Sequence, residues 1–147
     1  GAPVSDAQAY TGSNSVEIVG TADLVAMPGI DGGQITLTAM QYIPSGTTGD
    51  TFFILMNQYP ADKDWSLQLK YSLGAGTIND GAGTIVYDKW VKIECVIDLD
   101  NNLMDVYYDG ELLQSGQWDD TAHTTFQGID LYSAGASSVF YDDIVIK

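Results

Sequence analysis

The sequence contains no arginine and only five lysines against twenty acidic residues, which gives a formal net charge of −15. Proteins that bind nucleic acid neutralise phosphates with lysine and arginine, and anionic membrane surfaces attract the same cationic side chains. We therefore expect neither nucleic acid nor a membrane as a partner. No apolar run approaches the roughly 20 residues that a membrane-spanning helix needs, so no transmembrane segment is expected.

Cysteine and histidine occur once each, as Cys95 and His123. A single cysteine cannot form an internal disulfide, and these two residues cannot supply the four nitrogen and sulfur ligands of a closed zinc site. Cys95 lies in a strand-like apolar run, which favours a buried, inert thiol over a catalytic one. His123 lies in a polar loop, and no Gly-x-Ser-x-Gly motif accompanies it. We therefore interpret His123 as a solvated loop residue.

Glutamate is also scarce, because only Glu17, Glu94 and Glu111 accompany the many aspartates. Aspartate favours turns and loops, whereas glutamate favours helices, so this composition is typical of a secreted β-protein. Hydrophobic residues make up 45% and charged residues 17%, a balance that argues against disorder. The length fits one domain, which we predict to span residues 1–147. We expect this domain to be a monomer. The abrupt polar start at Gly1 leads us to expect a mature fragment or an excised module.

The apolar pattern predicts strands along the whole chain and almost no helix. Apolar and polar residues alternate with a period of two, which is typical of half-buried antiparallel strands. The long predicted strands are 34–43, 51–57, 65–71 and 90–99. The shorter ones are 14–19, 23–27, 83–87, 103–108, 111–114, 128–133 and 138–146. Turn pairs such as Asp109-Gly110 lie between them, so we predict an all-β fold, a two-sheet antiparallel β-sandwich.

Several short motifs resemble those of a known group. These are the segments 9–18 (AYTGSNSVEI), 88–94 (DKWVKIE), 97–101 (IDLDN), 106–112 (VYYDGEL) and 140–146 (FYDDIVI). Together they look like a concanavalin A-like, laminin G-like jelly roll and resemble the non-catalytic carbohydrate-binding modules of secreted bacterial enzymes. The resemblance spans nearly the whole chain and implies the fold more strongly than the function.

The same resemblance implies a structural calcium ion between the first and the last strand. Calcium takes six to eight oxygen ligands and readily combines aspartate with backbone carbonyls. The implied ligands are Asp142 or Asp143, opposite the segment Gly12, Ser13 and Asn14. Neighbouring residues of a strand point to opposite faces, so we expect at most one of the two aspartates to face inward. The alternative is a solvated pair of carboxylates capped by backbone N–H groups.

Aromatic residues supply the candidate sugar-binding positions, since a sugar ring packs its C–H face on a flat aromatic ring while polar groups bind its hydroxyls. Trp118 lies in a polar segment without core periodicity, so we expect it to be exposed and to stack on a ligand. Trp65 and Trp90 each begin a strand and favour structural roles. The candidate carbohydrate-binding residues are Tyr42, Tyr59, Trp65, Gln68, Lys70, Lys92, Tyr107 and Trp118.

Five of these residues lie on the polar faces of their predicted strands: Tyr42, Gln68, Lys70, Lys92 and Tyr107. If these strands are neighbours, the five side chains would form the floor of one groove, with Lys70 and Lys92 side by side. The alternative is an ordinary solvated sheet face. Catalytic members of the resembled group typically carry a Glu-x-Asp-x-(x)-Glu strand, but the nearest stretch, 94–100 (ECVIDLD), has another spacing and no second glutamate. We therefore predict a non-enzymatic module.

The preferred function is a non-catalytic carbohydrate-binding module that holds a secreted enzyme near its polysaccharide. The net charge favours a neutral or sparsely charged polysaccharide, because anionic chains would be repelled at long range. The alternative is a laminin G-like adhesion or spacer domain. A glycoside hydrolase or lyase of the same fold is the third reading.

Overall fold

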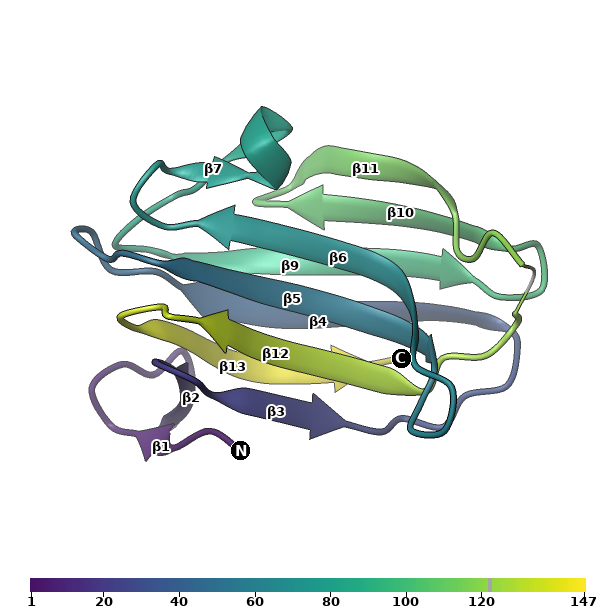
Figure 1. Ribbon diagram of the computed structural model, residues 1–147, viewed down its shortest axis with the longest axis horizontal. Coiled ribbons are helices and arrows are strands. Elements are labelled where there is room, and N and C mark those ends of the chain that lie inside the picture. The colour runs from purple at the N-terminus through teal and green to yellow at the C-terminus, as the bar shows by residue number, and fades with distance from the viewer. Residues whose placement is uncertain (122) are drawn as a thin grey trace.

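In the computed structural model, which describes residues 1–121 and 123–147, two antiparallel sheets pack face to face (Figure 1). The seven-stranded sheet has the order β1-β2-β13-β4-β9-β10-β11. Its strands are β1 (Val4–Ser5), β2 (Ser15–Ile18), β4 (Gln34–Tyr42), β9 (Trp90–Asp98), β10 (Leu103–Tyr108), β11 (Glu111–Gln117) and β13 (Val139–Ile146). The predicted two-sheet sandwich is therefore confirmed.

The six-stranded sheet has the order β3-β12-β5-β6-β7-β8 and lies in front of the other sheet in Figure 1. Its strands are β3 (Asp23–Ala26), β5 (Asp50–Gln58), β6 (Asp64–Ser72), β7 (Thr77–Ile78), β8 (Gly83–Thr84) and β12 (Gly128–Ala134). A 3-10 turn, η1 (Asn79–Gly81), joins β7 to β8. Over residues 1–121 and 123–147, no helix is both long and apolar enough to cross a membrane.

The long strands begin and end within a residue of their predicted limits, because their period-two pattern continues to the turns. The strands predicted at 90–99, 103–108 and 111–114 are confirmed and pair consecutively as β9, β10 and β11, which form a meander. Asp109 and Gly110 both have positive φ, at 51° and 83°, as the type I′ hairpin turn requires. Two differences are that β11 runs on to Gln117 and that only Gly83–Thr84 of the expected strand 83–87 is paired.

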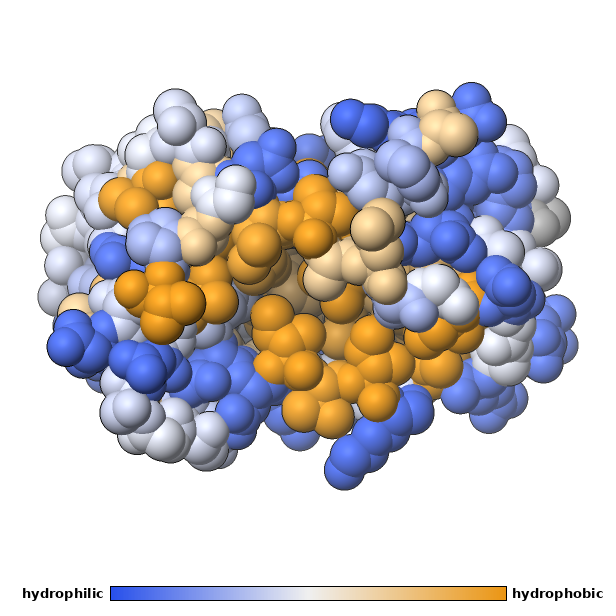
Figure 2. Space-filling model, turned by 90° about the horizontal axis from the view of Figure 1, so that it is seen from below, coloured by the Kyte–Doolittle hydropathy of each residue, from blue (hydrophilic) through white to orange (hydrophobic). Residues whose placement is uncertain are grey.

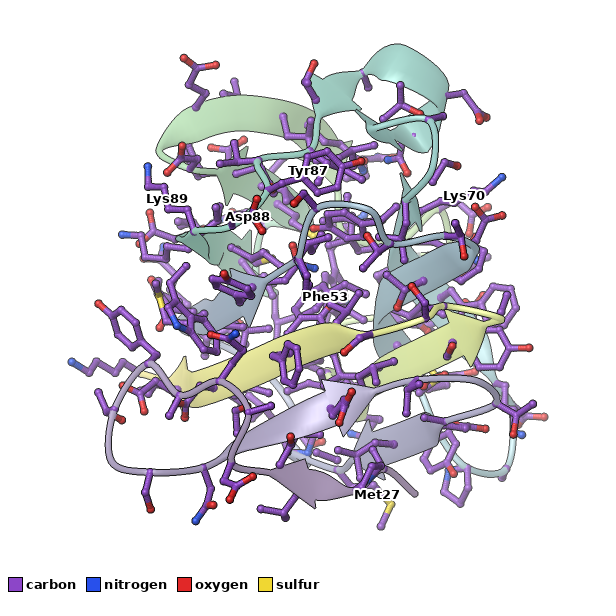
Figure 3. The ribbon with its side chains drawn as sticks, turned by 90° about the vertical axis from the view of Figure 1, so that its left-hand side faces the viewer. Met27, Phe53, Lys70, Tyr87, Asp88 and Lys89 are labelled. Carbon is purple, nitrogen blue, oxygen red and sulfur yellow. The ribbon has the colours of Figure 1, made fainter. Side chains whose placement is uncertain are left out.

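The core lies between the two sheets and is built from the inward members of each alternating strand. Leu37, Phe53, Leu69, Ile97 and Val106 are all buried, and Figure 3 shows Phe53 between the sheets. Burying each such side chain stabilises the fold by about 1.5–3 kcal/mol. The outward members of the same strands are therefore left to form two opposite outer surfaces.

Cys95 belongs to this core, as predicted. It is buried without a disulfide partner, and burial raises the pKa of its thiol to about 12. The thiol therefore stays protonated at neutral pH and is not a nucleophile.

Candidate functional site

Three rows of side chains cross the outer surface of the six-stranded sheet, which we call the six-strand face. Strand register places β12, β5 and β6 side by side. The first row is Tyr132, Phe52 and Lys70, the second is Asp130, Ile54 and Gln68, and the third is Gly128, Met56 and Trp65. A register shift after Leu55 pairs Met56 with Trp65, which turns Trp65 outward. This face therefore combines aromatic, aliphatic and polar groups.

Aromatic rings stand at two corners of the six-strand face. Trp65 is 56% exposed and Tyr132 is 39% exposed, and the Tyr132 ring centroid lies 5.8 Å from that of Phe52. Between them Ile54 and Met56 point outward, yet they are 3% and 2% exposed, because neighbouring side chains cover them. The accessible groups of this face are thus the aromatic rings and the polar side chains, and Ile54 and Met56 pack beneath them.

Asp130 is the unusual polar group of this face. Its Oδ1 atom is buried and has no hydrogen-bond partner among the residues that the structure describes. Burial raises the pKa of the Asp130 carboxyl to about 6, with a further contribution from the carboxylate of Asp23, while Lys63 acts in the opposite direction. Only the Oδ1 atom is thus left without a partner, because a side-chain hydrogen bond with Asp23 also contributes to the raised pKa of this carboxyl.

The segment that joins β5 to β6 bounds the same face at one end. Lys63 Nζ lies 5.8 Å from the ring centroid of Tyr59 in this segment. At the other end, Lys70 Nζ lies 3.5 Å from Asp50 Oδ2. The structure thus brings together the predicted residues Trp65, Gln68 and Lys70 on one face, with Tyr59 at its border.

The opposite surface, which we call the seven-strand face, carries a second aromatic group. Phe140, Tyr42 and Trp90 lie directly opposite one another on β13, β4 and β9. The Tyr42 and Trp90 ring centroids are 5.5 Å apart, and Tyr10 from the loop before β2 lies 5.8 Å from Trp90. Trp90 is therefore on an outer face and partly exposed, whereas its strand-start position suggested packing at the sandwich edge.

Lys92 and Tyr107, two further predicted residues, also lie on the seven-strand face. Lys92 follows Trp90 by two positions on β9 and forms an ion pair with Glu94 at 3.3 Å. Tyr107 on β10 pairs with Glu94.

The expectation of one groove floor that holds Lys70 and Lys92 side by side is wrong. Lys70 lies on β6 in the six-stranded sheet and Lys92 on β9 in the other. In Figure 3, Lys70 lies at the outer side of the six-stranded sheet, and Phe53 separates it from the opposite sheet. Both positions are outward in their own strands, but the two sheets face away from each other. The candidates therefore divide between two surfaces.

The expectation that Trp118 is an exposed stacking residue is also wrong. Trp118 is 1% exposed and packs edge-on against Phe126, with ring centroids 5.5 Å apart. Its indole N–H donates a hydrogen bond to the carbonyl of Thr125 at 3.0 Å. The chain turns into the core after β11, so a single tryptophan is buried in a segment whose other residues are polar.

Asp142 and Asp143 lie beside the loop before β2, and Asp142 shows the capping by backbone N–H groups that was predicted as the alternative to a calcium site. Asp142 Oδ2 accepts hydrogen bonds from the backbone N–H groups of Tyr10 and Thr11, at 2.8 and 3.1 Å. Asp143 Oδ1 accepts one from the Thr11 hydroxyl at 2.6 Å. Burial alone would raise the pKa of Asp142, yet these backbone hydrogen bonds hold it below its usual value.

Neither aspartate belongs to the buried core, which agrees with the expectation that at most one of them faces inward, and β13 is irregular at this point. The pairing register shifts between Asp142 and Val145, and Asp143 has a φ of 43°. A bulge of this kind re-aims a side chain, so both carboxylates reach Thr11. Asn14, Asp142 and Asp143 border one hollow of about 340 Å³, whereas Gly12 and Ser13 contribute no lining to it.

A possible metal-binding group lies next to Trp65. Ligand atoms of Asp64, Asp119 and His123 all lie within 4.8 Å of one another. Asp119 Oδ2, however, already accepts hydrogen bonds from the Thr121 N–H, the Thr121 hydroxyl and the His123 N–H. Burial alone would raise the pKa of Asp119, and these hydrogen bonds outweigh it and lower the pKa. His123 is thus paired with carboxylates rather than simply solvated. Because Asp119 Oδ2 already accepts three hydrogen bonds from its own segment, this group of side chains is better suited to holding the loop in place than to binding a cation.

An apolar hollow of about 300 Å³ opens at the edge of the sandwich between β3 and β13. Figure 2 shows the hydrophobic side chains that gather around it. Its lining is Leu24, Ala26, Met27, Pro28, Ile129, Leu131, Ile144 and Ile146. These side chains offer no polar group that could orient a sugar hydroxyl, so this hollow differs in chemistry from both outer faces.

The sequence analysis missed Phe52, Asp130 and Tyr132 as site residues. Phe52 lies in the continuous apolar run 51–57, which was predicted as a strand but has no polar alternation to mark its outward positions. The signal for the other two was present, because Asp130 and Tyr132 alternate with Ile129 and Leu131.

No protein-family model matches the sequence, and no curated protein sequence matches it. Solved structures do match in fold. The chain superposes on a sialidase with a TM-score of 0.71 and 12% identity, covering 99% of this chain and 16% of the sialidase chain. It also superposes on the carbohydrate-binding module CBM66 from Bacillus subtilis, with a TM-score of 0.65, 11% identity, and coverage of 100% and 92%.

A galectin, LEC-6 from Caenorhabditis elegans, matches with a TM-score of 0.55 and 13% identity, covering 86% of this chain and 95% of the galectin. At such identities the likeness shows the fold alone. The chain is a jelly-roll β-sandwich of two antiparallel sheets, which confirms the fold that the sequence motifs implied.

Proposed function

We propose that this chain is a non-catalytic glycan-binding module whose binding surface is the six-strand face. The observation that carries the proposal is the exposed ring of Trp65, which lies on the same face as the exposed side chain of Gln68. A sugar ring would pack its C–H face on Trp65, while Gln68 and Asp130 would bond its hydroxyls. The fold likeness to CBM66 and to a galectin supports this reading.

The charge of the six-strand face favours a neutral or sparsely charged polysaccharide. Asp23, Asp50, Asp64 and Asp130 lie on or beside it, against Lys63 and Lys70. With a net charge of −15 for the whole chain, uronate-rich or sulfated chains would be repelled. We place this role outside the cell, next to an enzyme that acts on the same polysaccharide.

Affinity electrophoresis through gels that contain different polysaccharides tests this proposal. We expect retardation in at least one neutral polysaccharide, and clearly weaker retardation of Trp65→Ala. Leu112→Ala is the matched control, because Leu112 is 57% exposed but lies on β11 of the other sheet. Migration unaffected by every glycan would favour the adhesion or spacer reading, and equal retardation of wild type and Trp65→Ala would remove the site from this face.

Glycoside hydrolysis is a second candidate, because Asp130 has a carboxyl pKa of about 6 on the proposed binding face. A glycosidase needs such a protonated carboxylic acid together with a second carboxylate, and Asp23 interacts with Asp130. Release of reducing sugar by wild type, and its loss in Asp130→Asn, would establish this candidate. A module without catalysis would release none in either form.

A structural calcium ion held by Asp142 and Asp143 is a separate proposal, supported by the position of both carboxylates and Asn14 at one hollow. The other lining residues of this hollow are mostly apolar, namely Val4, Ser15, Val16, Tyr141 and Ile144. An ion that binds only the folded state stabilises it by mass action. We expect chelation to lower the melting temperature, and Asp143→Ala to lower it and remove the effect of chelator. Identical melting curves with and without chelator, on protein shown by elemental analysis to be metal-free after treatment, would reject the ion.

A further inference from the structure

We propose that the seven-strand face carries a second glycan-binding site, centred on Tyr10, Tyr42 and Trp90. One molecule would then hold two polysaccharide segments on opposite sides. This inference rests on the proposed function of the six-strand face, and it adds a separate site with its own residues.

The second site is an aromatic row that crosses three neighbouring strands. Phe140, Tyr42 and Trp90 are direct cross-strand neighbours, with Phe140 and Tyr42 ring centroids 6.4 Å apart. The accessible rings of Tyr10, Trp90 and Tyr42 follow one another at centroid separations of 5.8 and 5.5 Å, a length that suits a short stretch of sugar chain. Phe140 is 4% exposed and supports the row, whereas Tyr42 and Trp90 remain partly exposed.

Tyr10 extends this row and is fixed in place by its backbone. The N–H groups of Tyr10 and Thr11 both donate to Asp142 Oδ2, which holds the loop against the sheet. The Tyr10 side chain is nevertheless 48% exposed, so it does not merely fill a core gap. A rigid, accessible ring loses little entropy when a ligand stacks on it.

Hydrogen-bond donors and acceptors lie in the rows of side chains next to the aromatic row. Lys92 pairs across the strands with Met40, and Met40 with Asp142. The side chains of Lys92 and Glu94 are 47% and 30% exposed. An ammonium donates hydrogen bonds and a carboxylate accepts them, so this pair can bond the hydroxyls of a neutral sugar without favouring a charged one.

The two faces point away from each other because they are the outer surfaces of two packed sheets, as Figures 1 and 3 show. Sheets in a sandwich pack about 10 Å apart, and the core fills the space between them. Two sites in this arrangement engage different chains or distant parts of one chain. Such bivalent binding raises apparent affinity for a polymer by about 10²-fold or more, and it cross-links long chains.

The test uses a soluble neutral polysaccharide that retards the wild-type protein, together with a short oligosaccharide cut from it. Retardation reports binding, and turbidity of the mixture with the long polymer reports cross-linking. The variants are Tyr10→Ala, the ring-preserving control Tyr10→Phe, Trp65→Ala, and the double variant Tyr10→Ala/Trp65→Ala. Lys92→Ala probes the same site without altering the aromatic row, and circular dichroism verifies that each variant is folded.

We expect wild type and Tyr10→Phe to give turbidity with the polymer. Tyr10→Ala and Trp65→Ala should each lose turbidity while still binding the oligosaccharide, and the double variant should bind at least about tenfold more weakly than either. Lys92→Ala should weaken cross-linking in the same direction as Tyr10→Ala.

The second site is rejected if Tyr10→Ala and Lys92→Ala match wild type in turbidity and retardation while Trp65→Ala abolishes both. In that case the proposed function of the six-strand face stands alone. If only the seven-strand variants lose binding, the module has one site and it lies on the other face, which overturns the bivalent arrangement. Absence of retardation by any polysaccharide overturns both proposals.

Discussion

At the residue scale, Trp118 shows how one side chain changes the interpretation of a segment. Its ring is buried against Phe126, and its indole N–H donates a hydrogen bond to the carbonyl of Thr125. A buried tryptophan with a satisfied N–H contributes to stability and has no surface left for a ligand.

Replacing Trp118 should therefore destabilise the fold rather than remove a contact with a ligand. We expect Trp118→Ala to lower the free energy of unfolding by about 3–5 kcal/mol, because it leaves a large cavity in the core. Trp65→Ala, at an exposed position, should change it by less than about 0.5 kcal/mol. Urea denaturation followed by far-UV circular dichroism measures both, and equal stability of the two variants would contradict the burial of Trp118.

Asp130 makes stability depend on pH in a direction opposite to that of most carboxylates. Folding raises its pKa to about 6, above the value of about 3.9 for an unfolded aspartate. Between these values the folded state binds more protons than the unfolded state, so this group's contribution to stability falls as pH rises towards and through 6.

We therefore expect Asp130→Asn to melt at a higher temperature than wild type at pH 7, with the difference shrinking as pH falls to 4. Thermal melts at several pH values measure this difference. Asp6→Asn, which removes the same charge at an exposed position, is the control. A wild-type melting temperature above that of Asp130→Asn at pH 7 would contradict the assignment.

At the element scale, two turns meet at one end of the sandwich. Thr48 and Ser137 exchange hydrogen bonds between the loop before β5 and the turn between β12 and β13. Gly49 in the first loop has a φ of 85°, and a Cβ there would lie 2.1 Å from the carbonyl oxygen of Gly135. Only glycine fits this contact, because both the backbone conformation and the space exclude a side chain.

Gly49→Ala should therefore destabilise the protein more than Gly46→Ala. Gly46 also has positive φ, at 78°, but a Cβ there meets nothing within 4 Å. We expect Gly46→Ala to cost about 1–2 kcal/mol for the left-handed conformation alone, and Gly49→Ala to cost clearly more because the two turns must separate. Equal unfolding free energies for the two variants, measured by urea denaturation, would show that the turns do not meet so closely.

At the scale of the whole molecule, the excess of acidic groups acts on stability as well as on partner choice. The chain has a net charge of −15 on 147 residues, so its acidic side chains repel one another in the compact folded state. Salt screens this repulsion, since the Debye length falls from about 10 Å at 0.1 M to about 3 Å at 1 M.

We expect the melting temperature to rise as sodium chloride is added from low ionic strength. A charge-reduced variant with Asp6→Asn, Asp62→Asn and Asp80→Asn should gain less from the same salt. Differential scanning calorimetry compares the two forms, and an equal gain would assign the effect to something other than net charge.

The sequence by itself determined the local features of this protein. Period-two alternation predicted the long strands, Asp109-Gly110 predicted a hairpin turn, and the apolar context of Cys95 predicted its burial. Each of these depends on neighbours in the chain or on a residue's own conformational preference, so no knowledge of distant contacts was required.

Only the tertiary structure decided which outward side chains share a surface. Lys70 and Lys92 have the same local pattern, yet sheet order places them on opposite faces. Strand pairing between β12, β5 and β6 assembled Asp130 with Gln68 and Trp65, although these residues are far apart in the chain. Sheet order and register arise from long-range packing of the whole core, and a single strand's pattern is compatible with either sheet.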